Sequence, residues 1–204
     1  WPPIIRRRGQ RRTPSLNVAY QLSHNLLCQY ALASYLHSKG FHTLQHSLQM
    51  IVDEMATALH VDQVRVALLQ PEKSVLQVIA EHYDPQRATS ALGMTIPLEG
   101  NQLTQDVINS REMVVIEDAQ HNPRTAPVHT LFREQGIETV IIIPLIVNDE
   151  VLGTIGLDVL DKRPVPSDSL QLAETIVYQA ATAVQNARLF EQTQSALAET
   201  ETLY

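Results

Sequence analysis

Cysteine is almost absent from this chain of 204 residues, which holds Cys28 alone. One cysteine forms no internal disulfide and cannot supply a multi-cysteine zinc or redox site. Glycine is also scarce, at 7 residues, and no phosphate-cradling Gly-Lys-Ser/Thr loop is present. Neither a Gly-x-Ser-x-Gly elbow nor a His-Glu-x-x-His pair is found. These absences argue against an enzyme, and the single cysteine suits the reducing cytoplasm, where we expect the protein to be located.

Long apolar runs are missing as well, so nothing in the sequence predicts a membrane-spanning helix or a signal peptide. The chain begins at Trp1 rather than at methionine and ends inside a helical pattern at Tyr204. We therefore expect it to be part of a longer protein, with an output domain after Tyr204. A membrane anchor before Trp1 is compatible with this expectation.

Positive charge is concentrated at one end of the chain. Five of the 15 basic residues are arginines between residues 6 and 12, which leaves 10 basic residues against 22 acidic ones elsewhere. Together with Pro2, Pro3 and Gly9, these arginines predict a flexible leader over residues 1–15. Such a cluster could contact nucleic acid or flank a membrane segment, but we favour a solvated linker. The acidic remainder argues against a nucleic-acid-binding domain.

The most informative stretch is TVIIIPLIVNDEVLGTIGLDVLD, residues 139–161, which predicts two adjacent strands joined by a tight turn at Asn148-Asp149. The first strand is nearly all aliphatic, which predicts a central strand covered on both faces. In the second strand the odd-numbered residues form an apolar face that should be covered by helices. The other face is mixed and could line a cavity. For Thr154 and Asp158 on that face we favour packing and solvation of a rim over contact with a ligand.

The order of the remaining elements predicts an α+β fold. A largely antiparallel central sheet is expected, with helices on both faces and long helices at both termini. The expected elements are a helix over residues 16–38 that Gly40 ends, a helix from Thr43, a hairpin over 63–81, a short strand over 95–98, a helix near 103–108, a strand over 113–116, a loop over 117–125, a short helix over 127–135 and a long helix from an N-cap at Ser167.

A family resemblance rests on four segments in a fixed order. They are IPLEGNQLTQDVINSREMVVIEDA, NPR, GIETVIIIPLIVNDEVLGTIGLDV and QLAETIVYQAATAVQNARLF. Their order and spacing resemble the GAF domain over residues 41–190. The resemblance implies a small-molecule pocket on one face of the sheet, capped by the shorter helices and loops. It also implies four parts of the chain: a leader over 1–15, a dimerisation helix over 16–40, the domain over 41–190 and a helical extension over 191–204.

Domains similar to this one sense ligands for sensor histidine kinases, cyclases, phosphodiesterases and transcription activators. The resemblance implies a regulatory domain of a bacterial sensor histidine kinase, with a ligand-free dimerisation or linker module as the alternative. The Asn-Lys-Phe-Asp-Glu signature of cyclic-nucleotide binders is missing. Where bilin binders carry a Cys-His pair, this chain has Val128-His129, so no covalent bilin is expected. One cysteine also excludes the methionine sulfoxide reductase branch. The ligand therefore stays unknown.

The ligand pocket implied by the resemblance should lie on the sheet face away from the long terminal helices. Its expected lining residues are Asp118, Arg124, His129, Phe132, Thr139, Ile141 and Ile143. Arg124 could neutralise an anionic ligand, but we favour an ion pair with Asp118 that ties down the loop. The histidines show no metal-ligand spacing, so no metal site is expected.

The last helix carries an apolar seven-residue repeat that is longer than one domain can bury. Its expected dimer-interface residues are Ile176, Ala183, Phe190 and Leu197. The alternative is that these residues only cover the sheet, which explains the residues nearest the start of the helix. We expect a parallel homodimer, in which ligand binding changes the packing of a helical rod and so reaches the output domain.

Overall fold

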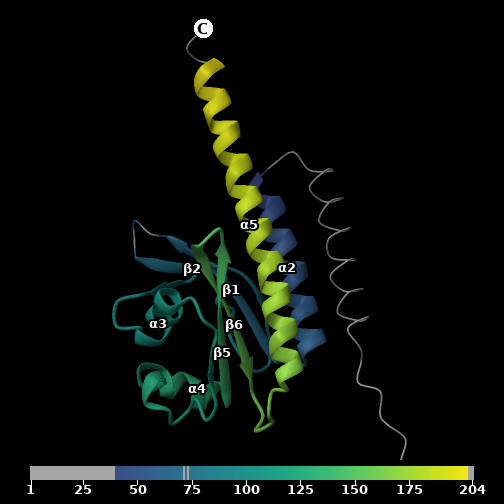
Figure 1. The fold of residues 1–204 in the computed structure, drawn as a ribbon. Helices are drawn as coiled ribbons and strands as arrows, with labels where there is room; N and C mark the ends of the chain where they lie inside the picture. The colour runs from purple at the N-terminus through teal and green to yellow at the C-terminus, as the bar shows by residue number, and fades with distance from the viewer. Residues whose placement is uncertain (1–39, 71, 73, 202–204) are drawn as a thin grey trace, which may run out of the picture.

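The computed structural model describes residues 40–70, 72 and 74–201 (Figure 1). These residues form an α+β domain around a six-stranded sheet in the order β3-β2-β1-β6-β5-β4, in which every neighbouring pair is antiparallel. The elements are α2 (Gly40–Leu59), β1 (Gln63–Gln70), β2 (Val75–His82), β3 (Thr95–Pro97), α3 (Gln102–Ser110), β4 (Val114–Ile116), η2 (Pro123–Val128), α4 (His129–Gln135), β5 (Thr139–Val147), β6 (Glu150–Val159) and α5 (Ser167–Glu201). The predicted sheet is confirmed, and the helix predicted over residues 16–38 lies outside the described residues.

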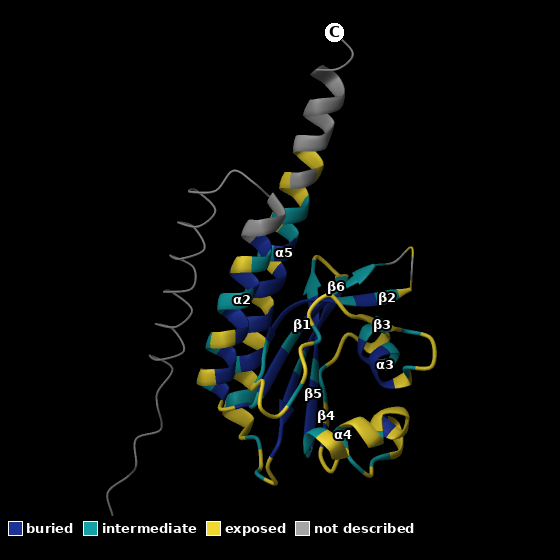
Figure 2. Ribbon diagram, turned by 180° about the vertical axis from the view of Figure 1, so that it is seen from behind, coloured by how far each residue is buried: buried dark blue, intermediate teal, exposed yellow. Residues whose placement is uncertain are grey.

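Helices cover both faces of the sheet, as Figure 1 shows. The long helices α2 and α5 lie side by side against one face, and α3 and α4 lie on the other. The largest apolar core fills the space between the sheet and the two long helices, and it includes Leu48 and Met55 of α2 and Val177 of α5 (Figure 2). Burial of such side chains is the main source of stability for a domain of this size.

The predicted hairpin of β5 and β6 is confirmed, together with its turn. Asn148 and Asp149 have φ values of 48° and 65°, as a two-residue hairpin turn requires. The prediction that β5 is a central strand needs a correction. β5 lies between β4 and β6, one strand in from the edge, and the two central strands are β1 and β6.

A bulge in the hairpin changes which residues of β6 face the core. Leu145 lies opposite Gly153, whereas Ile146 lies opposite Val151, so Leu152 is the extra residue. Leu152 is fully buried in the core that packs on α2 and α5. Strict alternation had placed Leu152 on the mixed face, and that prediction is wrong because the bulge interrupts the period of two.

Three further boundaries differ from the sequence-based expectation. The helix predicted from an N-cap at Thr43 begins earlier, at Gly40. Ser167 is the first residue of α5 rather than its cap. A 3-10 helix, η2, begins inside the polar segment that was predicted as a loop. No helix among the described residues is long and apolar enough to cross a membrane.

Two glycines of β6 give a matched stability prediction. A Cβ atom on Gly153 would lie 2.1 Å from the carbonyl oxygen of Ala67, whereas a Cβ atom on Gly156 meets nothing within 4 Å. We expect Gly153→Ala to lower the free energy of unfolding by about 3 kcal/mol, because the main chain of β1 must move. Gly156→Ala should change it by no more than about 0.5 kcal/mol. Urea denaturation of both variants is the measurement, and equal stabilities would contradict the close approach of β6 to β1.

Candidate functional site

A row of residues crosses four strands on the sheet face away from α2 and α5. Ile142 of β5 lies opposite Gly156 of β6, Gly156 lies opposite Arg65 of β1, and Arg65 lies opposite Glu81 of β2. In the next row, Gln63 lies opposite Asp158. Because side chains of opposite residues share a face of an antiparallel sheet, the polar side chains meet at its centre. We call Gln63, Arg65, Glu81 and Asp158 the polar strip.

Arg65 connects the other three members of the polar strip. Its Nη1 donates a hydrogen bond of 2.5 Å to Asp158 Oδ2, and its Nη2 donates to Gln63 Oε1. Its Nε lies 4.0 Å from Glu81 Oε2. The side chains of Asp158 and Glu81 are 8% and 5% exposed, against 21% for Arg65. One partly accessible cation therefore serves two buried carboxylates, and truncation of such a pair leaves an uncompensated charge.

Glu81 also fixes the loop that precedes β3. Its carboxylate accepts hydrogen bonds from the hydroxyl of Ser90 and from the backbone N–H groups of Ala91 and Leu92, the last two at 2.9 and 3.2 Å. Three donors satisfy most of the acceptor capacity of this carboxylate. Asp158 is different, because Arg65 is the partner that the structure gives it. The polar strip therefore contains Glu81, which holds the loop before β3, and Asp158, whose side chain is paired with Arg65.

Two donors of the polar strip are buried without a hydrogen-bond partner. They are Gln63 Nε2 and Arg65 Nε. Gln63 is 1% exposed, so bulk water contributes little to the hydrogen bonding of its amide nitrogen. A buried donor without a partner costs about 1 to 3 kcal/mol, and such groups are uncommon in folded proteins. Two of them within one cluster make the polar strip the candidate site among the described residues.

Open space borders the polar strip. The position that a Cβ atom of Gly156 would take has no atom within 4 Å. Ile142, Gly156 and Arg65 are only partly buried, although β1, β5 and β6 are interior strands. Two small apolar clusters lie on either side, one around Leu103 and Val140 and the other around Leu76 and Val78. Room for another group therefore remains above Gly156 on this face.

Burial dominates the ionisation of Asp158. It raises the pKa of this carboxyl above its ordinary value, and the charge and hydrogen bond of Arg65 only partly offset the effect. The negative charge of Asp62 acts in the same direction as burial. The carboxyl group thus binds its proton more tightly in the folded protein than in the unfolded chain.

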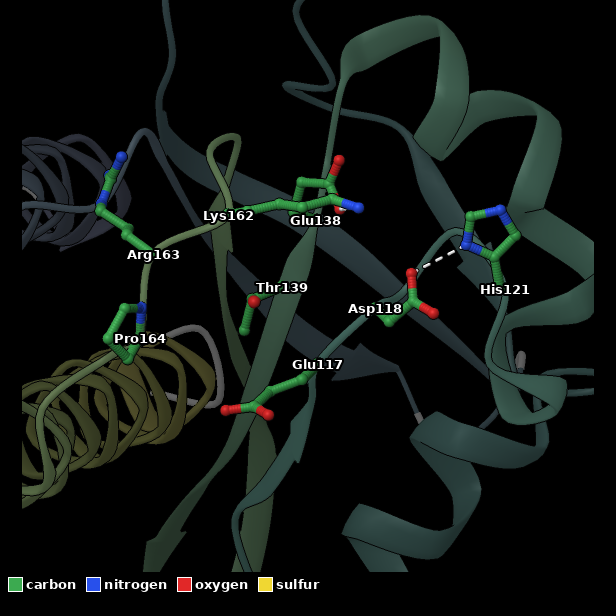
Figure 3. A pocket seen from close by; sticks show the side chains of 8 residues that line it. All are labelled: Glu117, Asp118, His121, Glu138, Thr139, Lys162, Arg163 and Pro164. Carbon is green, nitrogen blue, oxygen red and sulfur yellow. Dashed lines mark hydrogen bonds and ion pairs between the residues drawn. The ribbon is translucent and has the colours of Figure 1, made fainter.

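A separate polar pocket of about 380 Å³ lies at the sheet edge, where β4 ends, β5 begins and the segment after β6 passes (Figure 3). It is lined by Glu117, Asp118, His121, Glu138, Thr139, Lys162, Arg163 and Pro164. Asp118 and His121 point toward one another, and His121 Nδ1 lies 2.8 Å from Asp118 Oδ1. Their side chains are 62% (Asp118) and 65% (His121) exposed. Ion pairs with this exposure contribute little to stability, because water screens them. This pocket is a solvated surface feature, in contrast to the buried polar strip.

The ion pair predicted between Arg124 and Asp118 is wrong. Arg124 pairs with Asp106 of α3 at 3.0 Å, and Asp118 pairs with His121. The polar loop is nevertheless tied down, because Asp106 anchors η2 to α3. The sequence could not distinguish two acids that approach the same arginine from different elements.

The remaining predicted pocket residues separate in space. His129 Nε2 lies 2.8 Å from the carbonyl oxygen of Asn122, and Phe132 packs partly into the cluster under α4. Thr139 lines the edge pocket. The placement of Ile141 and Ile143 on the pocket face is wrong, because both belong to the core that packs on α2 and α5. They lie opposite Leu157 and Ile155, which the alternation of β6 had already assigned to the helix-covered face.

The predicted dimer-interface residues also separate. Ile176 is 4% exposed and packs in the core of its own chain, so its assignment to the interface is wrong. Ala183 is partly buried, and Phe190 is 43% exposed. The side chain of Leu197 lies outside the described residues.

Sequence reasoning missed Gln63, Arg65 and Glu81, and for Asp158 it favoured packing and solvation of a rim over contact with a ligand. The solvated rim is wrong, since Asp158 is 6% exposed at the centre of the sheet. A signal was present in the polar residues that interrupt β1 and β2, which include opposite charges at Arg65 and Glu81. Among the described residues, no group of three His, Cys, Asp or Glu side chains could hold a metal ion.

Comparisons with known proteins agree with this fold. The family model described as "GAF domain" matches residues 43–184. The formate hydrogenlyase transcriptional activator FhlA of Escherichia coli (strain K12) is 25% identical over 148 residues. That match covers 70% of this chain and 21% of the relative, so the chain spans about a fifth of the relative's length.

Solved structures give the same result. The phycoerythrobilin-bound GAF domain from a cyanobacterial phytochrome matches with a TM-score of 0.69 and 19% identity, over 84% of this chain and 96% of that chain. The GAF domain of a phosphoenolpyruvate-protein phosphotransferase from Coxiella burnetii matches with a TM-score of 0.66 and 17% identity, also over 84% and 96%. At these identities the likeness establishes the fold.

Two carboxylates with opposite pKa shifts give a pH prediction. The raised pKa of Asp158 means that stability falls as the pH rises from about 4 toward its folded-state pKa. Asp158→Asn should remove this fall, so its stability relative to the wild type should increase with pH. Hydrogen bonds from Gln102 and Arg124 lower the pKa of Asp106, so stability from that group is lost as the pH falls below about 4. Asp106→Asn should therefore show the opposite trend in urea denaturation, and parallel trends would contradict the assignment.

Proposed function

The chain belongs to the GAF domain family, and from this membership we propose that it is a small-molecule-sensing regulatory module of a larger bacterial signalling protein. The observation that carries the proposal is the polar strip with its two unpartnered buried donors beside open space. A buried cluster that served packing alone would gain stability by replacing such donors with apolar groups. A ligand that completes the hydrogen bonds explains why they are kept.

The output that we favour is a histidine kinase reached through α5, with a transcription activator as the second candidate. FhlA, a transcriptional activator, supports the second candidate, but the match covers 21% of that protein. Neither output changes the role proposed for the domain, because ligand binding and its transmission are properties of the described residues. The protein is proposed to act in the cytoplasm.

A contact from α2 to the sheet provides a route from the site to the long helices. Gln49 Nε2 donates a hydrogen bond of 2.8 Å to the carbonyl oxygen of Glu81. The side chain of the same Glu81 lies in the polar strip. One turn further along α2, Asp53 lies 2.7 Å from His82 Nδ1. Adjustment of β2 by a bound ligand would therefore act directly on α2, which packs against α5.

The end of α5 is proposed to form a parallel homodimer. The helix has 35 residues, which corresponds to about 50 Å. In its C-terminal half it carries Leu189 and Phe190, which are 49% and 43% exposed. Adjacent exposed apolar side chains on an extended helix favour pairing with a second copy. A dimer seam starting near Ala183 then continues the stripe that covers the sheet in each chain.

A ligand-free linker module is the alternative function. Its supporting observation is that Arg65, Gln63 and Asp158 already satisfy part of one another's hydrogen bonding. In that case the two unpartnered donors would lower the stability of the domain, and no ligand would pair them. Detection of a bound small molecule separates the two functions.

Filling the open space at Gly156 tests the sensing function. Native mass spectrometry of the freshly purified protein, followed by denaturing analysis for small molecules, should find a bound molecule in the wild type. Gly156→Leu should abolish that binding, because its side chain occupies the space above β6. Gly156→Ala is the matched control and should retain at least part of the bound molecule.

Thermal unfolding of both variants shows whether the fold survives. A wild type without any bound molecule, or a Gly156→Leu variant that folds and binds as the wild type does, would contradict a ligand site at the polar strip.

Light scattering across a dilution series tests the dimer. The wild type should have the mass of a dimer at micromolar concentration, and Phe190→Glu should shift it toward a monomer, because a buried unpaired carboxylate opposes association. Gln192→Glu, at an exposed position on the opposite side of the same helix from Phe190, is the control that should leave the mass unchanged. A wild-type monomer, or an equal effect of the two substitutions, would refute the proposed seam.

A further inference from the structure

We propose that the ligand of the polar strip is a neutral planar molecule that carries a hydrogen-bond acceptor and a donor side by side, such as a carboxamide or a heteroaromatic lactam. Its ring lies over Gly156, its acceptor receives a hydrogen bond from Gln63 Nε2, and its donor faces the carboxylate side of the strip. The inference rests on the proposed sensing function and adds the chemical class of the ligand.

Charge within the site disfavours an anionic ligand. The polar strip holds two carboxylates, Asp158 and Glu81, and one guanidinium, Arg65. Both carboxylates are nearly buried, so their repulsion of a third negative group is poorly screened. Arg65 is the cation of the strip, but its Nη1 is already bonded to Asp158, and an anion at its Nε would lie beside the Glu81 carboxylate, which is 4.0 Å from that nitrogen.

Hydrogen bonding within the site disfavours a cationic ligand. Glu81 already accepts from Ser90, Ala91 and Leu92, and Asp158 is paired with Arg65. A second cation would compete with Arg65 for the same oxygens and would lie beside its positive charge. The attraction to the carboxylates would then offset only part of the free energy needed to remove this cation from water.

A purely apolar ligand leaves the main requirement of the site unmet. It would fill the open space above Gly156, but Gln63 Nε2 and Arg65 Nε would stay without partners. An acceptor removes that penalty, and sites that present unpaired polar groups discriminate strongly between ligands that pair them and ligands that do not. The acceptor of an amide or a lactam fulfils this requirement without adding charge.

The surroundings of Gly156 favour a flat molecule. Gly156 lies between Ile142 and Arg65 in the row that crosses the sheet. An aliphatic side chain on one side and a guanidinium on the other provide a surface on which an aromatic ring can stack. The absent Cβ of Gly156 lets the ring approach the backbone of β6 closely.

Three probes of nearly equal shape separate the charge classes. Benzamide, benzoate and benzamidine are neutral, anionic and cationic at pH 7. Their dissociation constants for the full chain are measured by titration with ¹H–¹⁵N correlation spectra. We expect benzamide to bind at least about tenfold more tightly than either charged probe, because only benzamide pairs the free donor without adding charge.

Substitution of Gln63 assigns the contact. Gln63→Met should raise the dissociation constant of benzamide by about tenfold, because the hydrogen-bond donor is lost. Gln63→Glu removes the donor and adds a carboxylate, so the preferred probe should change from benzamide to benzamidine. Gln179 is the matched control: it lies on α5, against the other face of the sheet, and its Oε1 is also buried without a partner. Gln179→Met should leave all three affinities unchanged.

Several outcomes would overturn the inference. Tightest binding of benzoate or benzamidine to the wild type would reject the neutral class while keeping the site. Equal effects of Gln63→Met and Gln179→Met would reject the assignment of Gln63. Absence of binding for all three probes would also reject the inference, whereas the sensing function is decided separately by native mass spectrometry of the wild type and Gly156→Leu.

Discussion

The ion pair between Arg65 and Asp158 is the interaction around which the candidate site is built. It joins β1 and β6, the two central strands, on the face that the short helices leave partly open. Burial opposes the charge on Asp158, so the pair persists only while Arg65 stays in place. Gln63 and Glu81 hold Arg65 from either side, and Glu81 in turn fixes the loop before β3. The same cluster is therefore a structural connection and the candidate site of the domain.

The elements of the fold could be predicted because local patterns determine them. Asn148 and Asp149 predicted their turn through the backbone conformation that they tolerate, and the aliphatic run of β5 predicted an interior strand. The bulge at Leu152 could not be predicted, because it is a property of the pairing of β6 with β5 and leaves no signal in the residues of β6 alone. The faces of Ile141 and Ile143 could have been inferred, had the alternation of β6 been carried across the hairpin to β5.

The candidate site was largely hidden from sequence reasoning because its members are far apart along the chain. Arg65 and Asp158 are ordinary polar residues in their own strands, and only the pairing of β1 with β6 brings them together. The predicted site consisted partly of loop and helix residues such as Asp118 and His129, because the family resemblance implies that they line the pocket. Their side chains prove to hold the loops, with His121 and the carbonyl of Asn122 as partners. The order of the strands, rather than a local motif, brings the residues of the candidate site together.

The central claim is that the unpartnered donors of the polar strip contact a small molecule. The most direct measurement follows the side-chain N–H resonances of Gln63 and Arg65 in ¹H–¹⁵N spectra while a small-molecule extract of cells is added. The account predicts that the Gln63 amide and the Arg65 Nε–H resonances shift, whereas the amide of Gln179 on α5 does not. Shifts at the edge pocket around Asp118 and His121, with Gln63 and Arg65 unchanged, would contradict it.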